Sequence, residues 1–218
     1  MPSKKVVQEV FSQVSKRYDF FLRLITAGGI KNWQEELLKN TPYEGNRLDV
    51  GTGTGEVLLH SQNKGLRVGI DLSFEMLKIA KSKCKRCKFL VADAENMPFK
   101  DQTFGSITLS LVYRHLIDRK AFLKEAHRVL KEGGEVCMLD INRFFLTPFL
   151  VFLMKFLIKP LGVLLFGSEK WEFFVHSLEN SLSLEEVKEE LKGAGFEVKY
   201  EKRMLFGLVY VVCARVIK

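Results

Sequence analysis

LDVGTGTG, residues 48–55, predicts a short buried strand that ends in a glycine-rich turn. The glycines allow the backbone to turn sharply and to approach a ligand closely. Residues 56–62 can form a helix directly after the turn, and the start of such a helix offers unpaired N–H groups and positive potential to an anionic group. Because similar turns also occur without a ligand, the surrounding pattern has to decide between a binding loop and a plain turn.

Strands and helices alternate after this turn. Ser73 can cap a helix that runs to about Lys83. Asp118 can cap another that runs through Leu130, and we expect Gly133-Gly134 to stop it. Such alternation favours parallel βαβ units with right-handed crossovers. Four further apolar runs have the length of strands: residues 67–71, 89–92, 106–111 and 135–141.

The two ends of the chain depart from this alternation. Apolar residues recur every three or four positions over residues 4–24, which predicts a helix, and a second short helix is expected around residues 33–38. Ser183-Leu184-Glu185-Glu186 is a capping box that opens a helix near the other end. Residues 196–205 and 208–215 are strand-like and so closely joined that they must run antiparallel. We therefore expect an α/β fold with a seven-stranded, mostly parallel sheet, an antiparallel C-terminal hairpin and helices on both faces.

Two acidic positions favour a binding loop over a plain turn. Asp71 ends the second predicted strand, sixteen residues after Gly55 (71 − 55), where a carboxylate can accept hydrogen bonds from both ribose hydroxyls. Asp93-Ala94-Glu95 follows the third strand and can meet the edge of an adenine. Each acid alone could instead cap a helix. The turn and the two acids all fall at successive strand ends, however, where an open α/β sheet binds its ligand.

Two other nucleotide sites fit this pattern poorly. Glu56 stands where the dinucleotide-binding fingerprint has its third glycine, and the C-terminal hairpin departs from the dehydrogenase layout. A Walker-type phosphate loop does not fit either, because no Gly-Lys-Ser/Thr follows the turn.

The composition indicates a globular protein with a single domain over residues 1–218. A net charge of +8 fits either a lysine-rich solvated surface or attraction to an anionic partner. The densest basic cluster, residues 78–88, has no interleaved aromatic residues, so no nucleic-acid partner is expected. The polar segment after Met1 has no apolar signal-peptide core, which predicts a cytoplasmic location. There the four cysteines should be free thiols, and no metal site is expected because Cys84 and Cys87 lack a second close pair.

The motifs around the turn resemble those of the ubiquinone/menaquinone biosynthesis C-methyltransferases, a family of class I methyltransferases. The resemblance covers nearly the full length and implies a Rossmann-like class I methyltransferase fold with S-adenosylmethionine (SAM) as the cofactor. Its motifs are Phe11–Asp19, Trp33, Leu48–Gly55, Asp71-Leu72-Ser73, Ala92–Glu95, Met97–Phe99, Asp101–Phe104, His127–Lys131 with Gly133-Gly134, and Ala194–Phe196. The candidate cofactor-binding residues are Tyr18, Asp49, Gly51, Thr52, Gly53, Gly55, Asp71, Leu72, Asp93, Ala94, Glu95 and Ser110.

Arg114 and His115, just after the fourth strand, are the candidate catalytic residues. The family commonly has Arg-Asn here, so Arg114 matches the family and His115 departs from it. Methyl transfer mainly requires position and orientation, and loss of a phenolic proton would make a ring carbon nucleophilic. Arg114 stays charged near neutral pH, which suits it to order a water or stabilise a phenolate. His115 could be the base or only a helix cap, and Tyr18 could close over the cofactor or only pack within its helix.

Residues 144–167, FFLTPFLVFLMKFLIKPLGVLLFG, form the most hydrophobic stretch of the chain. Lys155, Lys159 and two prolines interrupt it, so it is not expected to span a membrane. Two interpretations stay open: a buried lid helix, or an interfacial helix that admits an isoprenoid tail while its lysines reach the headgroups. Within the single domain we thus expect a helical cap over residues 1–40 and an apolar insertion or lid over residues 144–182.

The expected acceptor is a small lipophilic molecule, such as an isoprenoid quinol of the demethylmenaquinone type, reached from the cytoplasm with peripheral membrane contact. Two alternatives remain open. One is a SAM-dependent methyltransferase of another small molecule, and the other is a non-catalytic module that binds SAM or a nucleotide. Methylation of a nucleic acid is disfavoured, because residues 110–113 read SLVY where amino-methylating enzymes carry an Asn-Pro-Pro-Tyr type motif.

Overall fold

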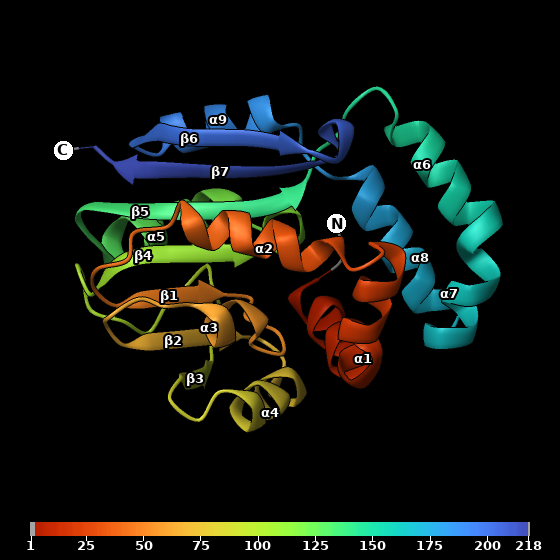
Figure 1. Ribbon diagram of the computed structural model, residues 1–218, viewed down its shortest axis with the longest axis horizontal. Helices are drawn as coiled ribbons and strands as arrows, with labels where there is room; N and C mark the ends of the chain where they lie inside the picture. Colours follow the sequence, from red (N-terminus) through yellow and green to blue (C-terminus); the bar gives the residue numbers. More distant parts are fainter. Residues whose placement is uncertain (1–2, 218) are drawn as a thin grey trace.

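The sheet of the computed structural model confirms the predicted architecture. The structure describes residues 3–217, and in that range seven strands form one sheet in the order β3-β2-β1-β4-β5-β7-β6 (Figure 1). β1 pairs in parallel with β2 on one side and with β4 on the other, so the strand order reverses beside β1. Such a reversal is where open α/β sheets bind ligands. The strands are β1 (Arg47–Val50), β2 (Arg67–Asp71), β3 (Lys88–Val91), β4 (Phe104–Ser110), β5 (Leu130–Ile141), β6 (Phe196–Met204) and β7 (Val209–Val216).

The C-terminal hairpin is antiparallel, as predicted. β7 runs antiparallel to both of its neighbours, β5 and β6. Val209 lies opposite Ile141 at the end of β5 and opposite Met204 at the end of β6. The 3-10 turn between β6 and β7, η3 (Leu205–Gly207), therefore lies at the same edge of the sheet as the carboxyl end of β5.

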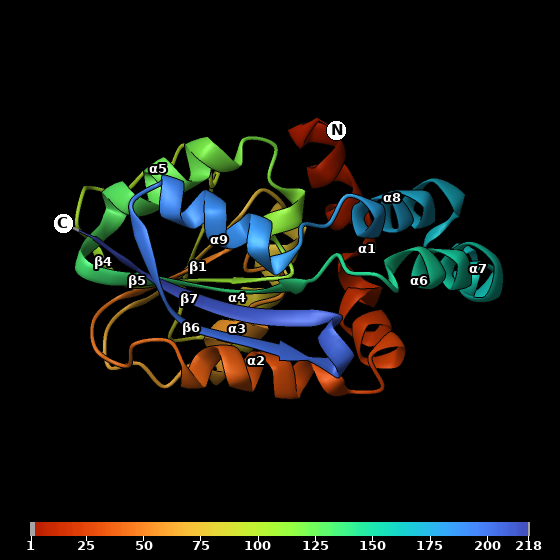
Figure 2. The same cartoon turned by 90° about the horizontal axis from the view of Figure 1, so that it is seen from above.

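Helices cover both faces of the sheet. α5 (Arg119–Val129) and α9 (Leu184–Gly193) lie on one face, and α2 (Gly29–Lys39) and α3 (Glu56–His60) lie on the other (Figure 2). α4 (Phe74–Lys83) packs beside β2 and β3. The predicted caps are present: the side chains of Ser73, Asp118 and Ser183 each accept a backbone N–H in the first turn of α4, α5 and α9.

The predicted stop of α5 at Gly133-Gly134 is wrong. α5 ends at Val129, and Leu130 is already extended and pairs with Phe104 of β4. The two glycines lie inside β5, where the register against β4 shifts between Phe104 and Ser106. Burial of Leu130 and its pairing with β4 therefore outweigh the local glycine signal.

Several helices gather beyond the carboxyl edge of the sheet (Figure 1). α1 (Lys4–Ile25) lies there beside α8 (Ser168–Glu179). α6 (Thr147–Leu153) continues through the π-helical stretch η2 (Met154–Ile158) into α7 (Lys159–Phe166). α8 packs back along α6 and α7, so the segment from α6 to α8 forms a helical hairpin attached to the end of β5.

The interpretation of residues 144–167 as a buried lid helix is wrong. Only 17% of its most apolar 18-residue window is buried. Val151 and Phe166 face the domain, whereas Phe149, Phe156 and Leu164 are exposed. The helix is apolar on all sides. Because α1 and α8 cover only one side of it, the apolar residues of the other side are exposed.

The expectation of free thiols is also wrong, because the structure pairs the four cysteines as disulfides. Cys137 and Cys213 lie directly opposite each other on β5 and β7, with their Cα atoms 4.1 Å apart. Cys84 and Cys87 follow α4, with Cα atoms 5.4 Å apart. The cross-strand register that brings the first pair together is not visible in the sequence.

Candidate active site

The glycine-rich turn is held in place by the buried carboxylate of Asp49. Thr52 Oγ1 donates a hydrogen bond to Asp49 Oδ2 at 2.6 Å, and Thr108 Oγ1 donates one to Oδ1 at 2.6 Å. Burial raises the pKa of Asp49 to about 6, while both hydrogen bonds act in the opposite direction. One carboxylate therefore ties together the end of β1, the turn and β4.

A cavity of about 510 Å³ opens over this turn, a volume within the usual range for small-molecule sites. Of the two candidate catalytic residues, His115 lines the cavity and Arg114 does not. All but one of the candidate cofactor residues line it: Tyr18, Asp49, Gly51, Thr52, Gly53, Asp71, Leu72, Asp93, Ala94, Glu95 and Ser110.

Gly55 is the candidate that does not line the cavity. It begins α3 with a φ of +81°, and a Cβ atom there would lie 2.9 Å from the Cβ of Ala80 on α4. Glycine is therefore required at this position for backbone conformation and for the close packing of α3 against α4. Gly53 differs, because a Cβ there would meet nothing nearer than a backbone oxygen at 4.0 Å and would project into open space.

Asp71 presents a carboxylate to the cavity from the end of β2. Its Oδ2 accepts the backbone N–H of Gly53 at 2.9 Å, and its Oδ1 accepts that of Ser73 at 2.8 Å. Burial raises the pKa of Asp71, and the backbone hydrogen bonds partly offset that effect. A carboxylate has about four acceptor positions, so Asp71 retains capacity for the hydroxyls of a ribose.

Asp93 and Glu95 follow β3, and their carboxylates make different contacts. Lys4 of α1 forms ion pairs with both, at 2.6 Å to Asp93 and 2.5 Å to Glu95. Glu95 also accepts the backbone N–H groups of Ile117 and Asp118, at 2.8 and 2.9 Å. Glu95 therefore fixes the turn that leads into α5, whereas Asp93 lines the cavity and its Oδ1 accepts the backbone N–H of Glu95 at 2.9 Å.

α1 forms the wall of the cavity opposite the sheet. Asp19 accepts a hydrogen bond from Thr54 Oγ1 at 2.8 Å and pairs with Lys83 at 2.7 Å, which fastens α1 to the turn and to α4. Tyr18 lines the cavity beside it. Burial raises the pKa of Tyr18 to about 12, so its phenol stays neutral near neutral pH.

Arg114 points away from the cavity into a buried ion pair. Its guanidinium pairs with Asp140 at the end of β5, and its backbone N–H donates to the same carboxylate at 3.2 Å. Its Nε donates to Ser177 Oγ of α8 at 2.9 Å. Arg114 therefore joins the sheet to the helical hairpin formed by α6 to α8.

His115 sits at the end of this chain of contacts. Ser177 Oγ lies 3.3 Å from His115 Nε2, and the ring stacks on Phe173 with centroids 5.6 Å apart and packs edge-on against Phe11 at 5.3 Å. Burial, with the positive charge of Arg114 as a second cause, holds the pKa of His115 well below its ordinary value. His115 is thus a neutral imidazole facing the cavity.

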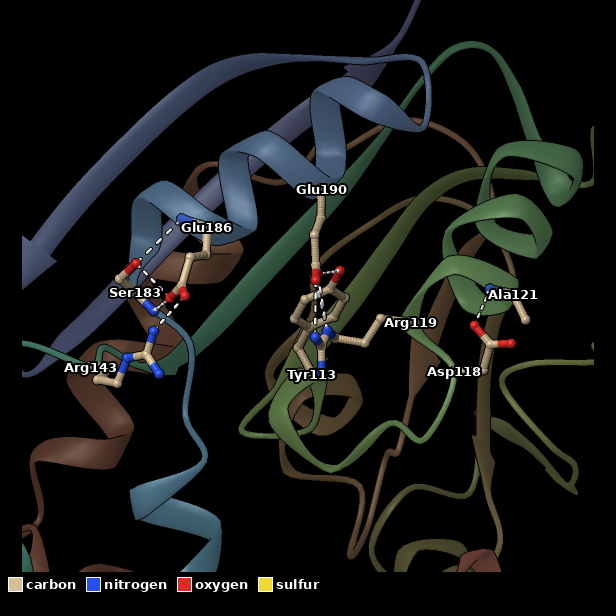
Figure 3. A network of polar contacts seen from close by, with 8 residues as sticks. All are labelled: Tyr113, Asp118, Arg119, Ala121, Arg143, Ser183, Glu186 and Glu190. Carbon is tan, nitrogen blue, oxygen red and sulfur yellow. Dashed lines mark hydrogen bonds and ion pairs between the residues drawn. The ribbon is translucent and has the colours of Figure 1, made fainter. Parts of the chain in front are cut away.

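A second polar network fixes the short turn η1 (Tyr113–His115) that carries these two residues (Figure 3). Tyr113 Oη donates to Glu190 of α9 at 2.6 Å, and Arg119 of α5 pairs with the same carboxylate at 3.0 Å. Figure 3 also shows the Ser183–Glu186 capping box that begins α9. η1 is therefore held from α5, α9 and the sheet at once.

The site fits SAM and offers no metal site. No group of His, Cys, Asp and Glu able to hold a metal ion is present within residues 3–217. A Cβ atom on Gly53 would meet open space beside the turn, and the carboxylates of Asp71 and Asp93 line the cavity as hydrogen-bond acceptors, which suits the ribose and adenine of SAM. The backbone N–H groups of the turn and the polar wall of α1 surround the remainder of the cavity.

Comparison with known proteins identifies the fold and the family of the chain. A solved structure from Thermotoga maritima, described as a SAM-dependent methyltransferase and possible histamine N-methyltransferase, matches 95% of this chain and 98% of its own with a TM-score of 0.74 and 21% identity. The protein is a class I SAM-dependent methyltransferase by its fold and site. The chain belongs to the ubiE/COQ5 methyltransferase family, whose model matches residues 1–215.

Two curated relatives support the same assignment. Demethylmenaquinone methyltransferase of Thermotoga maritima is 32% identical over 211 residues, which cover 91% of each chain. Ubiquinone/menaquinone biosynthesis C-methyltransferase UbiE of Geotalea uraniireducens is 34% identical over 206 residues, which cover 88% of each chain.

Three residues of the site were missed in the sequence analysis. Asp140 carries a visible signal, since it is an acid inside the otherwise apolar run of residues 136–141. Ser177 opens the stretch Ser177–Leu184, which resembles the family but gave no role for the side chain, and Phe173 carries no signal. Both belong to α8, whose packing against η1 depends on the whole helical hairpin.

Asp71→Ala should weaken SAM binding by about 1–3 kcal/mol, because the variant removes the acceptor for the ribose and leaves two backbone N–H groups without their partner. Isothermal titration calorimetry on folded protein measures the change. Asp101→Ala is the matched control, since Asp101 is an exposed carboxylate that does not line the cavity. Unchanged affinity in the Asp71 variant would reject the assignment.

Asp49→Asn should remove a pH dependence of stability. The folded pKa of Asp49 is raised to about 6 from 3.8, so between these values the folded state binds more protons than the unfolded state. Wild type should therefore gain about 1 kcal/mol over Asp49→Asn as the pH falls from about 7 to about 5. Denaturant unfolding at both pH values tests this, with Asp101→Asn as the control. A difference between wild type and Asp49→Asn that does not change with pH contradicts the burial argument.

Proposed function

We propose that this enzyme methylates a ring carbon of a small lipophilic hydroquinone of the demethylmenaquinone type. The observation that carries the proposal is the family match over residues 1–215, with relatives named for menaquinone and ubiquinone biosynthesis. SAM supplies an electrophilic methyl group. The chain's own residues have to orient the acceptor ring, exclude water and receive a proton.

The aromatic surroundings of His115 suit a flat acceptor ring. Phe11 and Tyr18 of α1 meet edge-to-face at 5.6 Å, and Phe173 of α8 stacks on the imidazole. Aromatic rings favour such stacked and edge-on neighbours. These side chains would hold a hydroquinone between α1 and η1, beside the glycine-rich turn.

The proton of the acceptor's phenol is assigned to His115. For Nδ1 to receive it, Nε2 must carry hydrogen and donate to Ser177 Oγ. Ser177 can accept this bond together with the one from Arg114 Nε, since a hydroxyl has two acceptor positions. Arg114 and Asp140 then act as positioning residues that fix Ser177, and through it the tautomer and orientation of His115.

The proposed acceptor also places the enzyme at a lipid surface. An isoprenoid quinol resides in a membrane, and the enzyme, which we place in the cytoplasm, would meet it through peripheral contact. The apolar insertion that follows β5 is the segment suited to that contact.

The substrate class is tested with purified enzyme and SAM that carries a labelled methyl group. We expect methylation of a demethylmenaquinol, with mass spectrometry placing the methyl group on the ring carbon. Histamine, catechols and other small amines and phenols serve as the competing panel. Turnover of one of these and not of the quinol would overturn the acceptor assignment and leave the methyltransferase assignment intact.

His115→Ala should lower kcat by about 10²-fold or more, the usual scale for loss of a positioned base. Because the pKa of His115 lies well below its ordinary value, wild type should keep full activity through about pH 6.5 and lose it only at a clearly lower pH, where the imidazole becomes protonated. The variant should lack that acid limb. His176→Ala, at an exposed histidine of α8, is the matched control.

A His115→Ala enzyme with wild-type kcat and an unchanged pH profile would assign the proton to a water instead. Ser177→Ala should give an intermediate loss of kcat with unchanged affinity for SAM, because it removes only the orientation of the imidazole.

A further inference from the structure

The outer face of α6 and α7 is an apolar surface without a protein partner among residues 3–217. Phe149, Phe152 and Phe156 recur at helical spacing along it, and the stripe continues with Leu157 inside the π-helical stretch and Leu164 beyond it. Phe156, Leu157 and Leu164 are 68%, 74% and 78% exposed. Scattered single apolar residues are normal on a protein surface, but a continuous exposed stripe marks a site of interaction.

The opposite side of the same helices is firmly packed. Gly162 lies so close to Trp171 of α8 that a Cβ atom there would come within 2.0 Å of the indole. Phe166 meets Phe21 of α1 edge-on at 4.7 Å, and Arg17 donates to the carbonyl of Leu165 at 2.9 Å. The outer face is therefore presented by a segment that is fixed to the domain.

The tip of the C-terminal hairpin adds to this surface. η3 holds Leu205 and Phe206 at positive φ, and Phe206 is 95% exposed. Gly207 lies next to Phe144, 3.9 Å from where its Cβ would be, and Phe144 in turn meets Phe145 edge-on. A strained turn that exposes a phenylalanine beside the start of α6 extends the apolar surface.

The charge left unpaired on the segment is positive. From Arg143 to Ser168 the chain has three basic residues and no acidic residue. Arg143 pairs with Glu186 and Lys155 with Glu179, so Lys159 is the one of the three without an ion pair among the described residues, and the whole chain carries a net charge of +8. Lys159 lies within the stripe and Arg17 at its α7 end, and both are exposed. A helix with an apolar face and basic residues is the pattern of segments that lie in the interface of an anionic bilayer.

We propose that the outer face of α6 and α7, together with the η3 tip, docks the enzyme on the surface of an anionic membrane, with the helix axis in the membrane plane. The two phenylalanine-rich elements enter the boundary between headgroups and acyl chains, and Lys159 meets lipid phosphates. This docking needs no acceptor and no turnover, so it stands or falls separately from the quinol assignment.

In-plane docking agrees with the attachments of the helix better than spanning does. Thr147–Phe166 is long and apolar enough to cross a bilayer. Spanning would, however, separate α7 from Trp171 and α1, while both ends of the segment remain joined to the same domain. Arg143 at one end pairs with Glu186 of α9, and α8 returns to α9 at the other. Lying flat exposes only the face that is already uncovered.

Flotation of the purified full chain with vesicles tests the proposal. We expect binding to vesicles of phosphatidylcholine with phosphatidylglycerol and at least tenfold weaker binding to phosphatidylcholine alone. Phe156→Ser combined with Leu164→Ser should weaken binding to anionic vesicles about tenfold or more. Phe74→Ser, which changes an exposed phenylalanine on α4, should bind as wild type does. Unchanged affinity for SAM shows that each variant is folded.

Charge reversal separates this surface from the basic cluster at residues 78–88. Lys159→Glu should weaken binding several-fold more than Lys85→Glu, which lies in that cluster. An equal or greater loss with Lys85→Glu would overturn the proposed surface, as would wild-type binding by the double variant or no binding by wild type. Retention after an alkaline carbonate wash would show spanning and overturn the in-plane arrangement. A dimer of the wild type that the double variant dissociates, seen by light scattering, would assign the face to a second copy of the chain.

Discussion

The buried carboxylate of Asp49 is the constraint on which the rest of the site depends. A charge inside a sheet is costly unless hydrogen bonds surround it, and here Thr52 and Thr108 supply them. The same bonds determine where the glycine-rich turn leaves β1. Only in that position can the N–H of Gly53 meet Asp71, which brings the turn and the ribose-binding acid to one side of the cavity. The hydrogen bonds that the buried carboxylate requires thus fix the geometry of the glycine-rich turn.

The acceptor side is built on a different principle, since its residues come from parts of the chain that a Rossmann-like core does not contain. η1 follows β4, but Ser177 and Phe173, which orient His115, belong to α8 of the insertion after β5. Asp140, the last charged residue of β5, holds Arg114 and lies just before the insertion begins. The sheet therefore positions the glycine-rich turn and its acids, and the insertion completes the surroundings of His115, which we propose as the acceptor side.

This division explains what the sequence could predict. Strand ends, caps and the glycine-rich turn are local signals, so the mostly parallel seven-stranded sheet and its antiparallel hairpin could be predicted, and all but one of the candidate cofactor residues line the cavity. Long-range packing is not a local signal. The sequence could not show that Arg114 turns away from the cavity towards Asp140, that Gly55 packs against Ala80, or that strand pairing ends α5 at Val129. The resemblance identified the family, but it did not reveal these side-chain contacts or the end of this helix.

The insertion has an inner face, which contacts η1, and an outer face, which is exposed. The packing of α8 against α6 and α7 connects the two faces. α8 turns Phe173 and Ser177 inward to η1, while α6 turns Phe149 and Phe152 outward and α7 exposes Leu164. Trp171 packs against Gly162 between the two layers, which fastens α8 to α7. Contact of the outer face with a lipid surface would therefore also define how α8 lies over η1. A lipophilic acceptor would then meet an imidazole whose orientation is set by the same helices that meet its membrane.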